Sequence, residues 1–162
     1  MTETPAWRAL RPADLPGVVA VAGAAHPDLF EAPEVFAEKL ALFPNGCFAL
    51  GRSDALRGYA FAHPWRGAPP ALNRFLGSLP QNTDFLYVHD VALTPAARGR
   101  GAGAAVVPRL VAAARAAGLP ALELVAVGGA ERFWARQGFV PTPGAAAGYG
   151  AGALRMRLTL SP

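Results

Sequence analysis

The chain has 162 residues, of which 52% are hydrophobic and 16% charged, and its formal net charge is +4. These values are typical of one globular domain with its own core and exclude an intrinsically disordered protein. Cys47 is the single cysteine, so a disulfide scaffold is excluded and a reducing compartment is favoured.

No membrane or nucleic-acid partner is expected. The longest apolar stretches, such as residues 18–25, fall well short of the ~20 residues of a membrane-spanning helix. Met1 to Leu10 lacks the basic start and apolar run of a signal peptide, so we expect a cytoplasmic protein. The arginines are scattered and not interleaved with aromatic residues, unlike the basic surface of a nucleic-acid binder.

The N-terminal third predicts a strand and two helices. Trp7 to Pro12 is a short extended run, and Asp14 then stands where the N-cap of a helix is expected. Pro33 to Leu42 combines a proline at the start with apolar residues at helical spacing, which predicts a second helix.

A hairpin and a long loop follow. Cys47 to Gly51 and Leu56 to His63 read as two strands joined by the polar turn 52–54. Pro64 to Asp84 is rich in Pro, Gly and Asn, and so long a connection is either a substrate loop or a surface insertion. Trp65, Arg66, Asn73 and Arg74 in this loop are candidates to meet a substrate, with surface decoration as the default.

The second half alternates strands and helices. Pro108 is expected to kink its helix or make the first turn irregular. The element order β-α-α-β-β-β-α-β-α-β-β predicts one mixed α/β domain. The segments are a buried strand Phe85–Leu93, a helix Gly101–Ala117 ended by Gly118, a strand Pro120–Val127, a short helix Gly129–Gln137 and a strand Ala153–Leu160.

The sharpest motif is Arg98-Gly99-Arg100-Gly101-Ala102-Gly103-Ala104, between a buried strand and a helix. Glycines let the backbone approach a ligand, and free amides at a helix start favour an anion, which indicates a phosphate cradle. A dinucleotide fingerprint is a weak alternative, because Glu123 sits in mid-strand where an edge acid is needed. A Walker loop is excluded, since no Lys-Ser/Thr follows.

These residues resemble the GCN5-related N-acetyltransferase (GNAT) family, whose signature is Gln/Arg-x-x-Gly-x-Gly/Ala at a strand-to-helix junction. The preceding Val91 to Pro95 looks like the family's bulged fourth strand and following proline. Ala130 to Phe139 is similar to a second family motif, Ala-x-x-Phe-Tyr-x-x-x-Gly-Phe. The resemblance implies a single-domain, mostly antiparallel twisted sheet flanked by helices, with acetyl-CoA as co-substrate and no metal.

The resemblance also implies a cofactor groove. Backbone groups of Val91 and Leu93 would pair with the pantetheine arm, and an amide near Val91 would stabilise the oxyanion. Ala130 and Phe133 would line the far wall of the groove. The full set implied to bind the cofactor is Val91, Ala92, Leu93, Arg98, Gly99, Arg100, Gly101, Ala102, Gly103, Ala104, Ala130, Phe133 and Trp134.

A general base is sought on the strand Phe85–Leu93. Strand alternation places His89 on one face and Asp90 on the other, with Asp90 favoured as a structural residue. His89 falls where many family members have Glu, and imidazole titrates near neutral pH, so His89 is the predicted base. The alternative is a core histidine.

The general acid departs from the family pattern, because Trp134 occupies the tyrosine position and an indole is not a useful acid. Tyr149 or Tyr87 is then a candidate, with Tyr149 preferred, unless the thiolate leaves unassisted. Cys47 reads as a buried hydrophobe, and neither His26 nor His63 has ligand-like spacing, so no metal site is predicted.

The sequence thus predicts acetyl transfer from acetyl-CoA to a primary amine of a small molecule or peptide, by direct attack in a ternary complex. An acyl-CoA-binding regulatory module without turnover is the alternative, and a dehydrogenase the weakest reading. The acceptor is not identified by the sequence, although the arginines permit an anionic one. A homodimer is possible.

Overall fold

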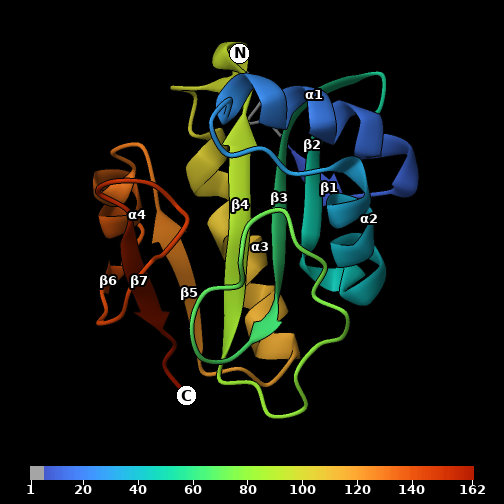
Figure 1. Ribbon diagram of the computed structural model, residues 1–162. Coiled ribbons are helices and arrows are strands. Elements are labelled where there is room, and N and C mark those ends of the chain that lie inside the picture. Colours follow the sequence, from blue (N-terminus) through green and yellow to red (C-terminus); the bar gives the residue numbers. More distant parts are fainter. Residues whose placement is uncertain (1–5) are drawn as a thin grey trace.

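The computed structural model describes residues 6–162 (Figure 1). Residues 1–5, part of the segment considered above for a signal peptide, lie outside the described residues. The element order agrees with the predicted one. In chain order the elements are β1 (Trp7–Ala9), α1 (Leu15–Ala25), α2 (Pro33–Leu42), β2 (Cys47–Arg52), β3 (Ala55–Trp65), β4 (Phe85–Leu93), α3 (Ala102–Ala116), β5 (Ala121–Ala126), α4 (Glu131–Arg136), β6 (Val140–Pro141) and β7 (Leu154–Thr159).

One seven-stranded sheet in the order β1-β2-β3-β4-β5-β7-β6 forms the centre of the fold. Its pairs are antiparallel except for β4 and β5, which run parallel at the middle of the sheet. That parallel pair is short, joining only residues 86–88 to 122–124. The mostly antiparallel mixed sheet predicted above is therefore confirmed.

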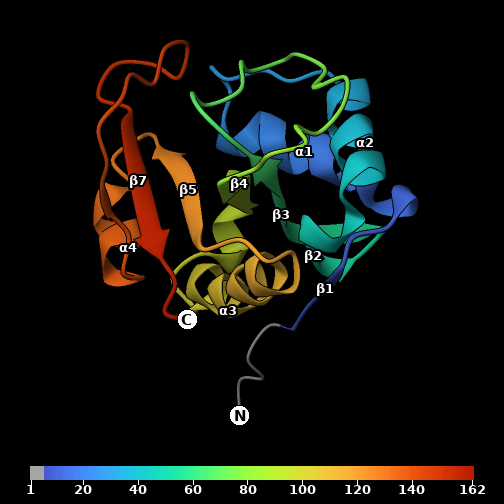
Figure 2. The ribbon, with the colours of Figure 1, turned by 90° about the horizontal axis from the view of Figure 1, so that it is seen from below.

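Helices cover both faces of the sheet (Figure 2). On one face, Val18 and Val21 of α1 and Phe36 of α2 pack on the aromatic rings of Tyr59 and Phe61. On the other face, α3 and α4 pack on Leu86, Val88, Leu122 and Leu124. Burial of β4 on both sides explains why its sequence is almost entirely apolar and aromatic.

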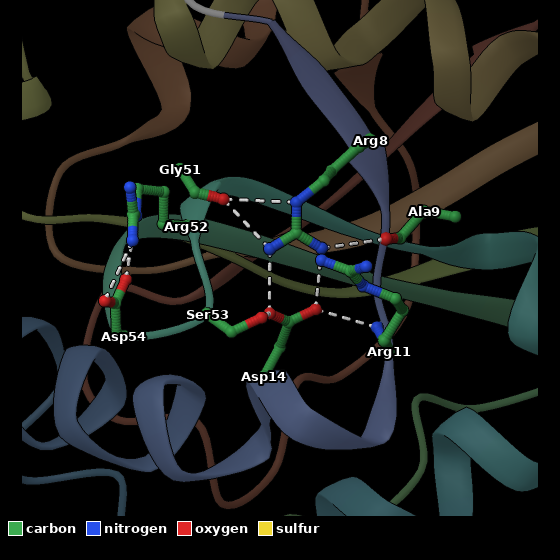
Figure 3. A network of polar contacts seen from close by, with 8 residues as sticks. All are labelled: Arg8, Ala9, Arg11, Asp14, Gly51, Arg52, Ser53 and Asp54. Atoms are coloured by element: carbon green, nitrogen blue, oxygen red, sulfur yellow. Dashed lines mark hydrogen bonds and ion pairs between the residues drawn. The ribbon is translucent and has the colours of Figure 1, made fainter.

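Asp14 occupies the N-cap position of α1, as predicted, but it does not cap the helix with its side chain. Asp14 ends a single 3₁₀ turn, Pro12–Asp14, that leads directly into α1, and its side chain makes no capping bond to that helix. Its carboxylate is fully buried and accepts hydrogen bonds from Arg8, the Arg11 amide and Ser53 (Figure 3). Asp14 thus ties β1 and α1 to the β2–β3 turn.

The boundaries of β3 and α4 differ most from the predicted ones. β3 continues through Pro64 to Trp65, while α4 is shorter than expected because Gly128 and Gly129 adopt positive φ before it. Helix α3 runs unbroken through Pro108. The kink or irregular first turn expected from that proline does not interrupt the helix, and the turn before it owes its shape to Gly99 and Gly101, with φ of 74° and 79°.

Candidate active site

The site begins where β4 and β5 separate. Their pairing ends at Val88 and Leu124, and a pocket of about 100 Å³ opens beyond that point. Residues from six segments of the chain line it: His26, Leu29, Glu31, Leu72, Val88, His89, Asp90, Val91, Leu124, Val125, Val127, Ala130, Trp134 and Tyr149. The lining residues on the sheet face covered by α3 are apolar. The acids and histidines lie on the face covered by α1 and α2.

One edge of β4 is free along this opening. In an antiparallel ladder, the backbone groups of successive residues point alternately toward the partner strand and away from it. The Thr94 backbone points toward β3, because its amide donates to the Arg57 carbonyl. Ala92 therefore pairs with β3, while the backbone groups of Val91 and Leu93 point toward the gap. These are the two residues implied to pair with pantetheine, and that assignment remains a prediction.

Asp90 was predicted to lie on the opposite face of β4 from His89, and this is wrong because β4 contains a β-bulge. Phe61 pairs with Asp90 and Ala62 with Val88, so β4 has one extra residue at His89. The extra residue breaks the two-residue alternation, and His89 and Asp90 therefore both face the pocket from the same side. The bulge lies two residues earlier than the position near Val91 that the resemblance implied.

His89 forms a buried pair with Glu31. Its Nε2 lies 2.6 Å from Oε1 of Glu31, and the two side chains are 0% and 4% exposed. Burial opposes ionisation of Glu31, but the hydrogen bond from His89 and its nearby positive charge lower the pKa of Glu31 overall. A carboxylate that accepts a hydrogen bond from an imidazole in this way fixes the orientation of the ring.

A second histidine and acid lie beside this pair. His26 Nε2 is 3.0 Å from Asp90 Oδ1, and the Tyr59 hydroxyl donates to Oδ2 of Asp90. The hydrogen bond to Asp90 raises the pKa of His26. Burial raises the pKa of Tyr59 well above its usual value, with the Asp90 charge adding to the effect. The pocket therefore has two histidine–carboxylate pairs.

Three buried side-chain nitrogens have no hydrogen-bond partner within residues 6–162: Nδ1 of His89, which lines the pocket, and His63 Nε2 and Lys39 Nζ, whose residues do not line it. The His63 and His89 rings lie 6.4 Å apart. Burial lowers the pKa of His63 to about 3 and also lowers the pKa of Lys39. In both groups burial disfavours the charged form, as expected for bases removed from water.

The long loop is held against this side of the molecule. The Asn73 amide donates to Glu31, the Ala32 amide donates to the Asn73 side chain, and Glu38 accepts from the Leu76 and Gly77 amides. The loop has no helix or strand from 66 to 84. Of the candidates named in it, Asn73 contacts the site, through its link to Glu31, whereas Arg66 and Arg74 are exposed.

Tyr149 also anchors the loop. Its hydroxyl donates to the Pro70 carbonyl at 2.6 Å and accepts from Tyr87 at 2.9 Å. Burial raises the pKa of Tyr149 to about 12, which makes it a weak acid. Tyr149 lines the pocket as predicted, and its role as the general acid remains a prediction.

The glycine-rich turn has the geometry of a cradle. Gly101 is left-handed at the start of α3, and the first bond of the helix joins the Ala105 amide to the Gly101 carbonyl. The first amides of α3 are thus open to a ligand. The indole of Trp7 donates to the Ala102 carbonyl at 2.8 Å and fixes this helix end on β1.

The second motif packs against this cradle. A Cβ on Gly103 would lie 3.1 Å from Cζ of Phe133, so the glycine permits close contact between α3 and α4. Trp134 is 7% exposed and stacks edge-on with Phe133 and Phe139. Ala130 and Trp134 line the pocket, and Phe133 lies beside the cradle, consistent with a groove wall.

Cys47, metal binding and membrane spanning were also considered from the sequence. Cys47 is buried, and burial raises the pKa of its thiol to about 12, which suits a core residue. Within the part of the chain that the structure describes, no group of three or more His, Cys, Asp or Glu side chains is arranged to hold a metal ion. Among the same residues, no helix is long and apolar enough to span a membrane.

Comparison with known sequences identifies the family. The sequence profile of the acetyltransferase (GNAT) family matches residues 7–139, which include both motifs, the β4 bulge and the pocket-lining residues up to Trp134. The chain belongs to the GNAT acetyltransferase family. No curated protein matches the sequence significantly.

Solved structures share the whole GNAT fold at low identity. The loading GNATL domain of CurA from Lyngbya majuscula has a TM-score of 0.80 at 13% identity, with 97% of this chain and 98% of that one covered. The GphF GNAT-like decarboxylase in complex with isobutyryl-CoA has a TM-score of 0.73 at 20% identity, with 95% of this chain and 98% of that one covered. Rv2747 from Mycobacterium tuberculosis, in complex with CoA, has a TM-score of 0.70 at 20% identity, with 97% of this chain and 100% of that one covered.

GNAT membership supports acyl transfer from an acyl-CoA co-substrate. The sequence predicts His89 as a site residue, but it does not predict Glu31 as the partner of His89 or any role for His26. Neither residue belongs to a motif, and each reaches β4 only through the fold.

Proposed function

We propose that this protein transfers the acetyl group of acetyl-CoA to a primary amine of a small molecule or peptide, by direct attack in a ternary complex. The observation that carries the proposal is the opening between β4 and β5. The pocket there is lined by Val91, on the free edge of β4, and by both members of the His89–Glu31 pair.

The residues of this chain have separate tasks. The amides from Arg98 to Ala104 hold the pyrophosphate, and the backbone of Val91 and Leu93 pairs with the pantetheine arm. This arrangement brings the thioester carbonyl to the β4 bulge. An amide near Val91 then donates to the carbonyl oxygen as negative charge develops there.

The proton of the amine passes to His89, directly or through a water. The amine nitrogen forms the new C–N bond, the C–S bond breaks, and CoA leaves as a thiolate that takes up a proton. Glu31 is bonded to Nε2 and keeps the His89 ring oriented, which leaves Nδ1 as the atom that takes up the proton. Since Trp134 replaces the usual tyrosine, the thiolate leaves unassisted or takes its proton from Tyr149 or Tyr87.

The test is product analysis. The purified protein is incubated with acetyl-CoA and a broad panel of primary amines, and both free CoA thiol and acetylated amine are quantified by mass spectrometry. Equal amounts of the two products are expected. Binding of acetyl-CoA with thiol release at the blank rate for every amine would instead identify a binding module, the alternative that Trp134 favours.

A further inference from the structure

We infer that the acceptor is a small primary amine with an apolar body and without a carboxylate group. The inference rests on the proposed function, because it names the substrate class of that same pocket. It replaces the anionic acceptor that the arginine content of the sequence had permitted.

The charged residues around the pocket favour an acceptor without a carboxylate group. Its charged lining consists of the acids Glu31 and Asp90 and the histidines His26 and His89, and no arginine or lysine of the described chain is among the lining residues. An amine arriving as an ammonium ion is attracted by the two acids. Each histidine of the lining is already bonded to one of these acids, so a carboxylate on the same acceptor would face the acids with no free cation to pair with, which is expected to weaken its binding about tenfold.

The cations that a carboxylate would need are engaged elsewhere. Arg155 and Arg157 are both bonded to Glu123, at 3.0 and 2.5 Å. Arg98 is near enough to disfavour the charged form of His26, but it lies on the cradle turn, where phosphate is expected to bind. Lys39 is 2% exposed, and burial lowers its pKa.

The apolar surface carries the second step. Leu29 and Leu72 line the pocket on the same side as the acids. Phe30 and Phe75 are 67% and 64% exposed, unusual values for phenylalanine. Glu31 and Asn73 contact each other directly, so the segments bearing these four apolar residues meet at the pocket. Leu29 and Leu72 provide the apolar lining for the body of the acceptor, and the segments that carry Phe30 and Phe75 adjoin it.

The test compares two ligands that differ only in a carboxylate, 2-phenylethylamine and L-phenylalanine. Each is titrated calorimetrically into the protein saturated with CoA, so binding is read without turnover. 2-Phenylethylamine is expected to bind at least about tenfold more tightly. Equal or tighter binding of phenylalanine, or no binding of either ligand, overturns the inference.

This design separates the two proposals. If 2-phenylethylamine binds selectively but is not acetylated when acetyl-CoA is supplied, acetyl transfer to this class fails while the pocket assignment holds. If amines bearing a carboxylate bind better and are acetylated, the function holds and the substrate class is wrong.

A variant tests whether the preference comes from this pocket. Leu29→Arg places a cation beside the two acids and is expected to reduce the preference for 2-phenylethylamine at least about fivefold. Val140→Arg adds the same charge at an exposed position of β6 and is expected to leave the preference unchanged. Leu72→Arg repeats the test if Leu29→Arg does not fold. An unchanged preference in the folded pocket variant contradicts the inference.

Discussion

The Nε2 atom of His89 lies 2.6 Å from Oε1 of Glu31, although the two residues are 58 positions apart in the chain. The β4 bulge brings Asp90 to the same side as this histidine, and Glu31 reaches the histidine from the segment that precedes α2. Such an oriented, buried pair has the form of a general base with its positioning carboxylate.

His89→Gln is expected to lower kcat for acetyl transfer about 100-fold, because proton removal from the amine is lost. Glu31→Gln keeps the histidine but removes its charge partner, so a loss of about tenfold is expected. The Kd for acetyl-CoA, measured by calorimetry, is expected to change less than about twofold in both variants. Wild-type turnover of His89→Gln at every pH would remove His89 from the mechanism.

The pKa of His26 should depend on Asp90. The hydrogen bond to Asp90 raises this pKa above the usual 6.5, so the pair stabilises the fold fully below pH 6.5. That stability is lost as the pH rises through the folded-state pKa of His26. An NMR titration of Asp90→Asn is expected to show a lower His26 pKa, with Asp84→Asn, an exposed position at the other end of β4, as control. An identical His26 pKa in Asp90→Asn and the control would contradict the assignment.

Asp14 is expected to be a strong contributor to stability. The guanidinium of Arg8, 2.8 Å away, holds the pKa of Asp14 well below its usual value, so the stabilisation is present above pH 4 and lost as the pH falls. Asp14→Asn should cost about 2–3 kcal/mol at pH 7, and the difference from wild type should shrink at pH 3. Urea unfolding measures both values.

The control for Asp14 is Asp54→Asn. Asp54 also pairs with an arginine, Arg52, but its side chain is 70% exposed (Figure 3). An exposed pair contributes little, so this substitution is expected to leave the unfolding midpoint unchanged. Equal losses in the two variants would show that burial of Asp14 is not the cause.

Lys39 is expected to destabilise the protein at neutral pH. It is 2% exposed with no partner for Nζ in the described residues, and burial lowers its pKa. Lys39→Met keeps the length of the side chain and should stabilise the fold by about 1 kcal/mol at pH 7. Because the folded-state pKa is lowered, the gain should shrink as the pH approaches 10.5. A loss of stability on urea unfolding would indicate that the charged lysine is needed beside Glu31.

The sequence predicted the elements well because each depends on local patterns. The apolar run 85–93 and the glycines before α3 are visible without a structure. The β4 bulge at His89 is not visible, since it depends on pairing with β3, and so the alternation rule misplaced Asp90. His26 and Glu31 reach β4 across 64 and 58 residues, and no local pattern encodes such contacts.

Calorimetric titration with acetyl-CoA tests the central claim, that the turn before α3 holds the co-substrate of an acyltransferase. Gly101 and Gly118 have similar positive φ, 79° and 71°, and no atom lies within 4 Å of a Cβ added at either. Gly101→Glu and Gly118→Glu therefore carry the same strain and charge, but they lie roughly 25 Å apart along α3. Micromolar binding by wild type and Gly118→Glu that is abolished in Gly101→Glu is the predicted result. Failure of the wild type to bind, or equal binding by both variants, would contradict the account.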